Sequence, residues 1–223
     1  MSKNILIIAA HPDDEVLGCG GSILKHKANG DQIFCLWMTN GIDSRNSINK
    51  EDKTIRNEGH KKAIEFISPS YFEAYDFPDN QLDKVSLLEL TKAIEKFLKI
   101  VKPDIIYTHF SHDLNIDHEL TCRAVMTATR PGSSTFVKEI YSFEIPSSTE
   151  WSINPLQFIP DTYMDISNYI EEKKQYLNCY EEEMRSYPHT RSIENIISLN
   201  QLRGGHVNVN FAESFITLRR LID

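Results

Sequence analysis

The sequence contains little cysteine and no long hydrophobic run. Its four cysteines are scattered among 223 residues and form no CxxC pair, a pattern that indicates neither a disulfide framework nor a cysteine-rich zinc site. No apolar run is long enough to span a bilayer, and a strand-like segment follows almost directly after the first residues. We therefore expect neither a signal peptide nor a transmembrane helix. Together these absences predict reduced thiols in a cytoplasmic protein.

Positive charge is also scarce. The 24 lysines and arginines are outnumbered by 32 aspartates and glutamates, which gives a formal net charge of −8. We expect no nucleic-acid partner, because binding a phosphate backbone requires clustered basic residues. A single phosphate held by local arginines is still compatible with this composition. The chain also lacks repeats, low-complexity segments and linkers, which favours one domain over residues 1–223.

The sequence does contain an alternation of short apolar segments with amphipathic ones. Strands are predicted at 4–11, 32–39, 71–77 and 104–108, and helices at 15–28, 51–66, 85–101 and 117–129. This order implies parallel strands with right-handed crossovers, and hence a Rossmann-like α/β fold with a mostly parallel sheet flanked by helices. The C-terminal third is less regular, with strands expected at 138–145 and 162–166 and helices at 168–185 and 192–202.

Three titratable side chains, His11, Asp13 and Asp14, stand where the first predicted strand gives way to a helix. Open α/β sheets bind their ligands at this end of their strands, so the position favours a functional site. The alternative is a helix cap, but capping requires only one of these residues. Glu15 is interpreted as a first-turn carboxylate that the helix dipole favours.

A second polar cluster follows the fourth predicted strand and ends with Asp117 and His118 at a helix start. If the first and fourth strands are neighbours, both clusters open onto the same edge of the sheet. His11, Asp14 and His118 then form a set of two histidines and one carboxylate. Three protein ligands with an open fourth position are the usual form of a catalytic zinc site. Asp13 is left beside the metal, where it could take a proton from water. By itself, His118 would be interpreted as an ordinary residue of a helix start.

The two motifs in this order resemble the zinc-dependent N-deacetylases of the LmbE/PIG-L family, which remove acetyl groups from substrates that contain N-acetylglucosamine. The resemblance implies Zn²⁺ held by His11, Asp14 and His118, although such donors also accept Fe²⁺ or Co²⁺. It implies catalytic roles for Asp13 as the base and for Asp117, which would hydrogen-bond a ligand or orient an acid. The implied partner is a small N-acetylated sugar or glycoconjugate, and a homo-oligomer is an expectation because family members are often trimers or hexamers.

The chain departs from the commonest family pattern at Asn115. Many members have a histidine three residues before the metal-binding histidine, and that histidine is usually interpreted as the general acid. Asparagine cannot protonate a leaving amine at neutral pH. We favour Asp13 acting as both base and acid, and Asp117, His112 and His206 stay as alternatives.

Several polar residues are candidates for binding the substrate. They are Arg56, Asn80, Asn115, Arg130, Trp151 and His206. Arg56 and Glu58 match an R-x-E arrangement common in the family, whereas the simpler interpretation is a solvated helix face. Trp151 ends a hydroxyl-rich segment that suits a carbohydrate pocket, but it could equally pack within a loop.

Gly18, Gly20 and Gly21 invite comparison with a dinucleotide-binding loop, but their spacing does not fit G-x-G-x-x-G directly after a strand. We expect these glycines to allow close helix packing or to leave room at the site. Two alternatives to a sugar deacetylase stay open. One is a deacylase of a small non-sugar N-acyl compound, and the other is a non-catalytic module of the same fold that binds a sugar or nucleotide.

Overall fold

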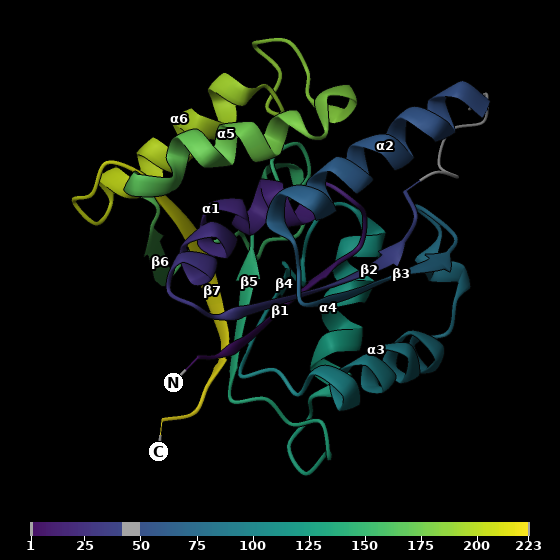
Figure 1. Cartoon of the computed structure of the whole chain (residues 1–223). Coiled ribbons are helices and arrows are strands. Elements are labelled where there is room, and N and C mark those ends of the chain that lie inside the picture. Colours follow the sequence, from purple (N-terminus) through teal and green to yellow (C-terminus); the bar gives the residue numbers. More distant parts are fainter. Residues whose placement is uncertain (1, 42–49, 223) are drawn as a thin grey trace.

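A seven-stranded mixed sheet lies between two layers of helices in the computed structural model, which describes residues 2–41 and 50–222 (Figure 1). The strands are β1 Asn4–Ala9, β2 Gln32–Thr39, β3 Tyr71–Phe77, β4 Ile105–His109, β5 Glu139–Phe143, β6 Thr162–Asp165 and β7 Ala212–Arg220. The helices are α1 Asp14–Ala28, α2 Lys50–Ile67, α3 Leu87–Val101, α4 Ile116–Ala128, α5 Ile170–Asn178 and α6 Ile193–Gly205. The strand order is β3-β2-β1-β4-β5-β7-β6. The first five strands pair in parallel and β7 is antiparallel to both of its neighbours, so the predicted fold class is confirmed.

Each face of the sheet carries its own hydrophobic core. Helices α1, α2, α5 and α6 cover one face, and α3 and α4 cover the other (Figure 1). Along β1, Ile5 and Ile7 belong to the first core, whereas Leu6 and Ile8 belong to the second. A strand buried on both faces has no reason to alternate polar and apolar residues, which explains the unbroken apolar run at the start of the chain.

The centre of the sheet positions the site. Ile5 of β1 pairs with Ile33 of β2 on one side and with Ile105 of β4 on the other. The first and fourth strands are therefore neighbours, which is the condition under which the two polar clusters share one edge. The chain builds β2 and β3 on one side of β1 and then crosses to β4 on the other. Such a reversal opens a crevice at the carboxyl ends of the strands, where ligands bind in open α/β sheets.

Helix α1 packs unusually closely on its surroundings. A Cβ atom added to Gly18 would lie 2.4 Å from the ring of Phe143 on β5, and one added to Gly21 would lie 2.8 Å from Ile166. No larger side chain fits at either position without a shift of its neighbour. The expectation that these glycines allow close packing is confirmed.

Two predictions for the C-terminal third are wrong. The segment Ala212–Arg220 forms β7, although no strand is predicted there. The prediction fails because Glu213 and Ser214 interrupt the apolar pattern of the segment. Both residues are nevertheless buried, through contacts with other elements. The helix predicted at 168–185 ends at Asn178. The three acidic residues Glu181–Glu183 form a separate short turn of 3-10 helix, since negative charge disfavours the carboxyl end of an α-helix.

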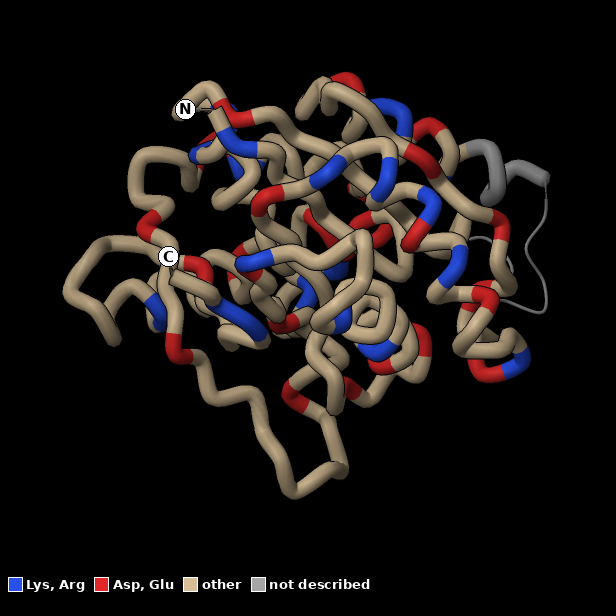
Figure 2. Tube along the Cα trace, turned by 90° about the horizontal axis from the view of Figure 1, so that it is seen from below, with Lys and Arg blue, Asp and Glu red and all other residues tan. Residues whose placement is uncertain are grey.

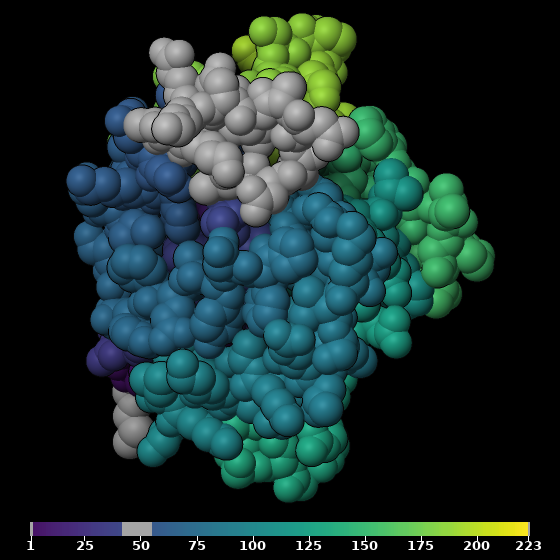
Figure 3. All heavy atoms as spheres, turned by 90° about the vertical axis from the view of Figure 1, so that its right-hand side faces the viewer, coloured from purple at the N-terminus to yellow at the C-terminus, as the bar shows by residue number. Residues whose placement is uncertain are grey.

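The surface carries mixed charge. Basic and acidic residues are interspersed along the trace in Figure 2, and that view shows no basic stripe among the described residues. Residues of α2, β3 and α3 form most of the side seen in Figure 3. Among the described helices, none combines the length and apolar character needed to cross a membrane.

Candidate metal centre and active site

The two polar clusters meet at the carboxyl ends of β1 and β4. A cavity of about 170 Å³ opens there, and its lining includes His11, Asp13, Asp79 and Asn115. His11 and Asp13 follow β1, Asp79 follows β3, and Asn115 follows β4. These residues are distant in the sequence, but they lie close together because each follows the carboxyl end of a parallel strand in the same sheet.

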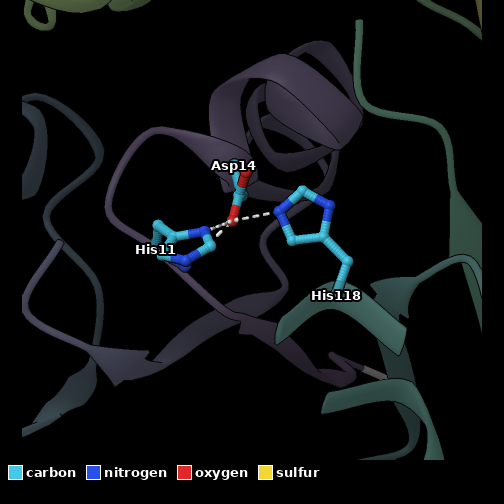
Figure 4. A group of neighbouring side chains, drawn as sticks. All are labelled: His11, Asp14 and His118. Atoms are coloured by element: carbon cyan, nitrogen blue, oxygen red, sulfur yellow. Dashed lines mark hydrogen bonds and ion pairs between the residues drawn. The ribbon is translucent and has the colours of Figure 1, made fainter. Parts of the chain in front are cut away.

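His11, Asp14 and His118 point toward one another (Figure 4). One potential ligand atom from each residue lies within 4.8 Å of the other two. Asp14 Oδ2 is 3.1 Å from His11 Nδ1 and 3.4 Å from His118 Nε2. Asp14 Oδ1 and His118 Nε2 are buried without a hydrogen-bond partner, and each such atom costs roughly 1–3 kcal/mol. Two imidazoles and one carboxylate with unsatisfied atoms fit a divalent metal.

The electrostatics of this group also suit a cation. Burial alone would lower the pKa of His118, but the Asp14 and Asp113 carboxylates raise it to about 9. Burial alone would raise the pKa of Asp14, whereas His118 and His109 hold it well below its ordinary value. The buried Asp14 carboxylate is therefore ionised, and metal ions compete with protons for its histidine neighbours.

Asp113 contacts His118, and the segment after β5 in turn contacts Asp113. Asp113 Oδ1 lies 3.1 Å from His118 Nδ1, which is an ion-pair distance, although the angle is not that of a hydrogen bond. The Thr149 hydroxyl donates to Asp113 Oδ2 at 2.5 Å, and the Ser148 hydroxyl donates to Oδ1. A carboxylate behind a ligand histidine typically fixes the ring orientation. These two hydroxyls therefore support the candidate metal centre, and sequence reasoning missed this role of Asp113.

Asp117 holds His11 in a similar way. Its Oδ2 lies 3.1 Å from His11 Nε2 and accepts the backbone N–H of Asn80 at 2.6 Å. Its Oδ1 accepts the N–H of Leu82 at 3.0 Å. Asp79 Oδ1 is also 3.1 Å from His11 Nε2. His11, Asp79 and Asp117 form a second group with metal-ligand spacing, but both oxygens of Asp117 already accept backbone N–H groups.

Asp13 faces the cavity from a strained backbone. It occupies the N-cap position of α1 with φ 107°, yet its side chain caps no N–H group of the helix, so capping does not account for it. Burial raises the pKa of the carboxyl group to about 7, against the opposing effect of the Arg191 guanidinium. A group with that pKa can both accept and donate a proton near neutral pH.

Glu15 lies in the first turn of α1, as predicted, and it also has tertiary partners that the sequence did not indicate. It is fully buried and accepts hydrogen bonds from Trp37 Nε1 at 2.9 Å, Tyr176 Oη at 2.9 Å and Tyr180 Oη at 2.8 Å. The backbone N–H of Asp13 donates to the same carboxylate at 3.1 Å. These partners are tertiary, because β2, α5 and the residues just after α5 supply the donors.

Three of the predicted substrate contacts, Arg56, Asn80 and Asn115, line the cavity. The Arg56 guanidinium contacts Glu183 and the carbonyl of Gly41. Asn115 is the N-cap of α4. Its Oδ1 accepts the N–H of Asp117 at 2.9 Å, and its Nδ2 donates to Asn80 Oδ1 at 3.1 Å.

The structure does not bring Arg130, Trp151 and His206 to this cavity. Arg130 follows the far end of α4 and pairs with Glu95 at 3.5 Å, because α4 starts at the site and runs back to the opposite edge of the sheet. Trp151 is 54% exposed. His206 is the C-cap of α6, where it contacts Tyr163. His112, considered as an acid, also lies outside the lining and contacts Ser111.

Sequence reasoning also missed Arg191 and Glu183, which line the cavity from the region between α5 and α6. Arg191 Nη1 lies 3.0 Å from Asp13 Oδ2. No local motif marks either residue, since both stand in polar loop sequence. Only the packing of this region over the sheet edge brings them to Asp13.

Comparisons with known proteins agree with this geometry. Residues 6–129 match the model of the family described as "PIG-L: GlcNAc-PI de-N-acetylase". The chain is 28% identical over 169 residues to an uncharacterized deacetylase, YaiS, of Escherichia coli, covering 74% of this chain and 82% of that protein. It is 26% identical over 199 residues to a 4-oxalmesaconate hydratase of Pseudomonas putida, covering 79% of this chain and 72% of that one.

The fold resembles that of the N,N'-diacetylchitobiose deacetylase from Pyrococcus horikoshii, with a TM-score of 0.77 and 18% identity over 97% of this chain and 84% of that chain. The family model spans more than half of the sequence. The chain therefore belongs to the PIG-L family.

Proposed function

We propose that this protein hydrolyses the N-acetyl group of an amino sugar and releases acetate in a metal-dependent reaction. The observation that carries the proposal is the His11, Asp14 and His118 group, whose ligand atoms lie within 4.8 Å of one another beside the buried Asp13. Family membership supports the reaction class, because the family description names a de-N-acetylase.

The donor set suits Zn²⁺, and it also accepts Fe²⁺ or Co²⁺. When bound, such a metal supplies Lewis acidity and lowers the pKa of a coordinated water to about 7. Asp117 keeps His11 oriented through the 3.1 Å contact to Nε2, and Asp113 does the same for His118. The cavity lining also contains Asp13, Asp79 and Glu183. Asp79 lies against His11 and Glu183 pairs with Arg56, so we assign the proton transfer to Asp13.

Asp13 would act as the base and then as the acid. It accepts a proton as water attacks the amide carbonyl and returns it to the leaving amine. Asn115 cannot donate that proton, and both ends of its amide are already hydrogen-bonded. His112 and His206 lie outside the cavity lining, which strengthens the case for a single carboxylate in both roles.

An amino sugar fits the polar character of the cavity. Arg56, Asn80 and Asn115 offer hydrogen-bond donors or acceptors for hydroxyl groups. A relative in fold is named as a deacetylase of N,N'-diacetylchitobiose. A small non-sugar N-acyl compound is the neighbouring alternative.

The four free cysteines, three of them buried, support a reducing and hence cytoplasmic location.

A second candidate is hydration of an unsaturated carboxylic acid. The observation that favours it is the 26% identity to a 4-oxalmesaconate hydratase. The same metal ligands and base could add water to a double bond, and Arg56 offers a cation for a carboxylate.

The test measures metal content and product release in the purified, metal-loaded protein. We expect about one transition metal per chain and acetate release from N-acetylglucosamine-containing sugars, with both lost in His118→Ala. The matched control is His206→Ala, since His206 lies outside the cavity. Acetate only from non-sugar amides would favour the small-molecule alternative, and turnover only of unsaturated acids would favour the hydratase. A protein that takes up no metal would exclude both metal-dependent reactions and leave the non-catalytic module.

A further inference from the structure

Arg191 is held at both ends of its guanidinium group. Nη1 donates to Asp13 Oδ2 at 3.0 Å, and Nε donates to the Ser147 hydroxyl at 2.8 Å. The backbone is also fixed, because its N–H donates to His189 Nδ1 at 3.0 Å and its carbonyl accepts the N–H of Arg185 at 3.2 Å. A long, flexible side chain is thus restrained to one position at the wall of the cavity.

Asp13 requires such a restraint. Its backbone φ of 107° lies in the left-handed region that non-glycine residues avoid. Its side chain is only 5% exposed and caps no helix N–H group. A buried carboxylate without a fixed donor would lower its free energy by turning away from the cavity toward other polar groups.

We propose that Arg191 is a positioning residue that fixes the Asp13 carboxylate toward the cavity, with Ser147 orienting the guanidinium. The inference rests on the proposed function, in which Asp13 handles the proton. The guanidinium donates to one carboxylate oxygen, Oδ2, and thereby restrains rotation of the carboxylate. Arginine suits this task better than lysine, because its donors are arranged in a rigid fork.

The alternative for Arg191 is direct binding of an anionic group on the substrate. The two roles affect kinetics differently. A positioning residue changes the rate of the chemical step, since a misplacement of about 1 Å can cost about 100-fold in rate. A residue that binds ground state and transition state equally changes KM and leaves kcat unchanged.

The first experiment compares kcat and KM for acetate release by four variants. We expect Arg191→Ala to lower kcat by about 100-fold with little change in KM, and Arg191→Lys to recover part of the loss. Ser147→Ala should lower kcat by a smaller factor, because the positive charge of Arg191 remains but its guanidinium group is less firmly oriented. Arg185→Ala is the matched control, since this side chain is exposed on the same segment, and it should keep wild-type kinetics.

Added guanidinium ion should raise the rate of Arg191→Ala and leave Arg185→Ala unchanged, an effect that a purely structural role would not produce. An unchanged kcat in Arg191→Ala, or a rise in KM alone, would overturn the positioning role.

The second experiment needs no substrate and therefore separates this inference from the proposed function. It measures the melting temperatures of metal-loaded wild type, Asp13→Asn, Arg191→Ala and the double variant. We expect the double variant to melt at least ~3 °C above the temperature that the two single losses predict when summed, because a close pair couples the two changes. Additive losses would refute the restraint, even where acetate release is detected. If the losses are coupled but the protein releases no acetate, the proposed reaction is refuted and the restraint of Asp13 by Arg191 stands.

Discussion

Adjacent residues of one turn acquire different chemistry from their surroundings. Asp14 lies beside His118 and His109, which hold its pKa well below the ordinary value against the effect of burial. Asp13, one residue earlier, has its pKa raised to about 7 by burial. One carboxylate is therefore suited to bind a cation and the other to exchange a proton.

This difference predicts separable variants. Asp13→Asn should retain the bound metal but lose about 1000-fold in acetate release, as expected when general acid–base catalysis is removed. Metal content and initial rates on the same preparation check the prediction. A variant that keeps normal turnover would show that Asp13 is not the base, and loss of metal from this variant would place Asp13 among the ligands.

His60 on α2 predicts a pH dependence of stability that is independent of the active site. Its ring lies 4.4 Å from that of Trp37 and 6.5 Å from that of Tyr180, and burial lowers its pKa to about 4. In the unfolded chain this histidine has the ordinary pKa of about 6.5. Between these two pKa values the unfolded chain therefore binds a proton that the folded protein does not bind. The contribution to stability is present above pH 6.5 and falls as the pH drops from 6.5 toward 4.

The expected loss through His60 is about 2 kcal/mol between pH 7 and pH 5. His60→Phe should lack this component, which urea unfolding of both proteins at the two pH values will detect. His206→Phe serves as the control because His206 is exposed. An equal pH dependence in wild type and His60→Phe would contradict the prediction.

At the scale of elements, a buried ion pair joins α1, α5 and β7. Helix α1 departs from helical geometry at Cys19 (φ −147°), so the N–H groups of Gly21 and Ser22 need new acceptors. Both donate to the Glu213 carboxylate of β7, at 2.8 and 2.7 Å. Lys173 of α5 lies 2.7 Å from the same carboxylate, and both charged side chains are buried. Glu213 thus caps an internal helix start and balances a buried charge.

Removing both partners of this pair should cost less than the two single removals summed. Lys173→Met and Glu213→Gln should each lower the free energy of unfolding by about 3–5 kcal/mol, whereas the double variant should lose less than the sum. Lys174→Met is the control, since Lys174 pairs with Glu171 at the exposed surface and should change stability by less than ~1 kcal/mol. Urea unfolding measures all four variants, and additive losses would contradict a coupled pair.

At the scale of the whole molecule, the proposed metal joins the turn after β1 to the start of α4. A metal that binds only the folded state adds about 4 kcal/mol at a concentration 1,000 times its dissociation constant. Removal with a chelator should therefore lower the melting temperature by roughly 10 °C, at about 2–4 °C for each kcal/mol. Differential scanning fluorimetry with and without Zn²⁺ checks this, and His118→Ala should show no such shift. A wild-type protein whose melting temperature ignores both chelator and Zn²⁺ would contradict the metal centre.

The sequence by itself determined the features that depend on local pattern. These are the parallel β1–β4 core, the turn with His11, Asp13 and Asp14, and the helix start with Asp117 and His118. Strand and helix periodicity and turn residues act over a few positions, and parallel strands end at a common edge. The placement of these polar groups at one edge could therefore be expected before the fold was known.

Only the tertiary structure decided the features that depend on contacts between distant segments. Strand β7, the tyrosine contact that helps to bury Glu15 and the approach of Arg191 to Asp13 all depend on how the C-terminal third packs on the sheet. The same packing and helix direction keep Arg130, Trp151 and His206 away from the cavity. The physical reason is that a polar residue carries no local sign of its partner when that partner lies more than a hundred positions away, as Arg191 does from Asp13.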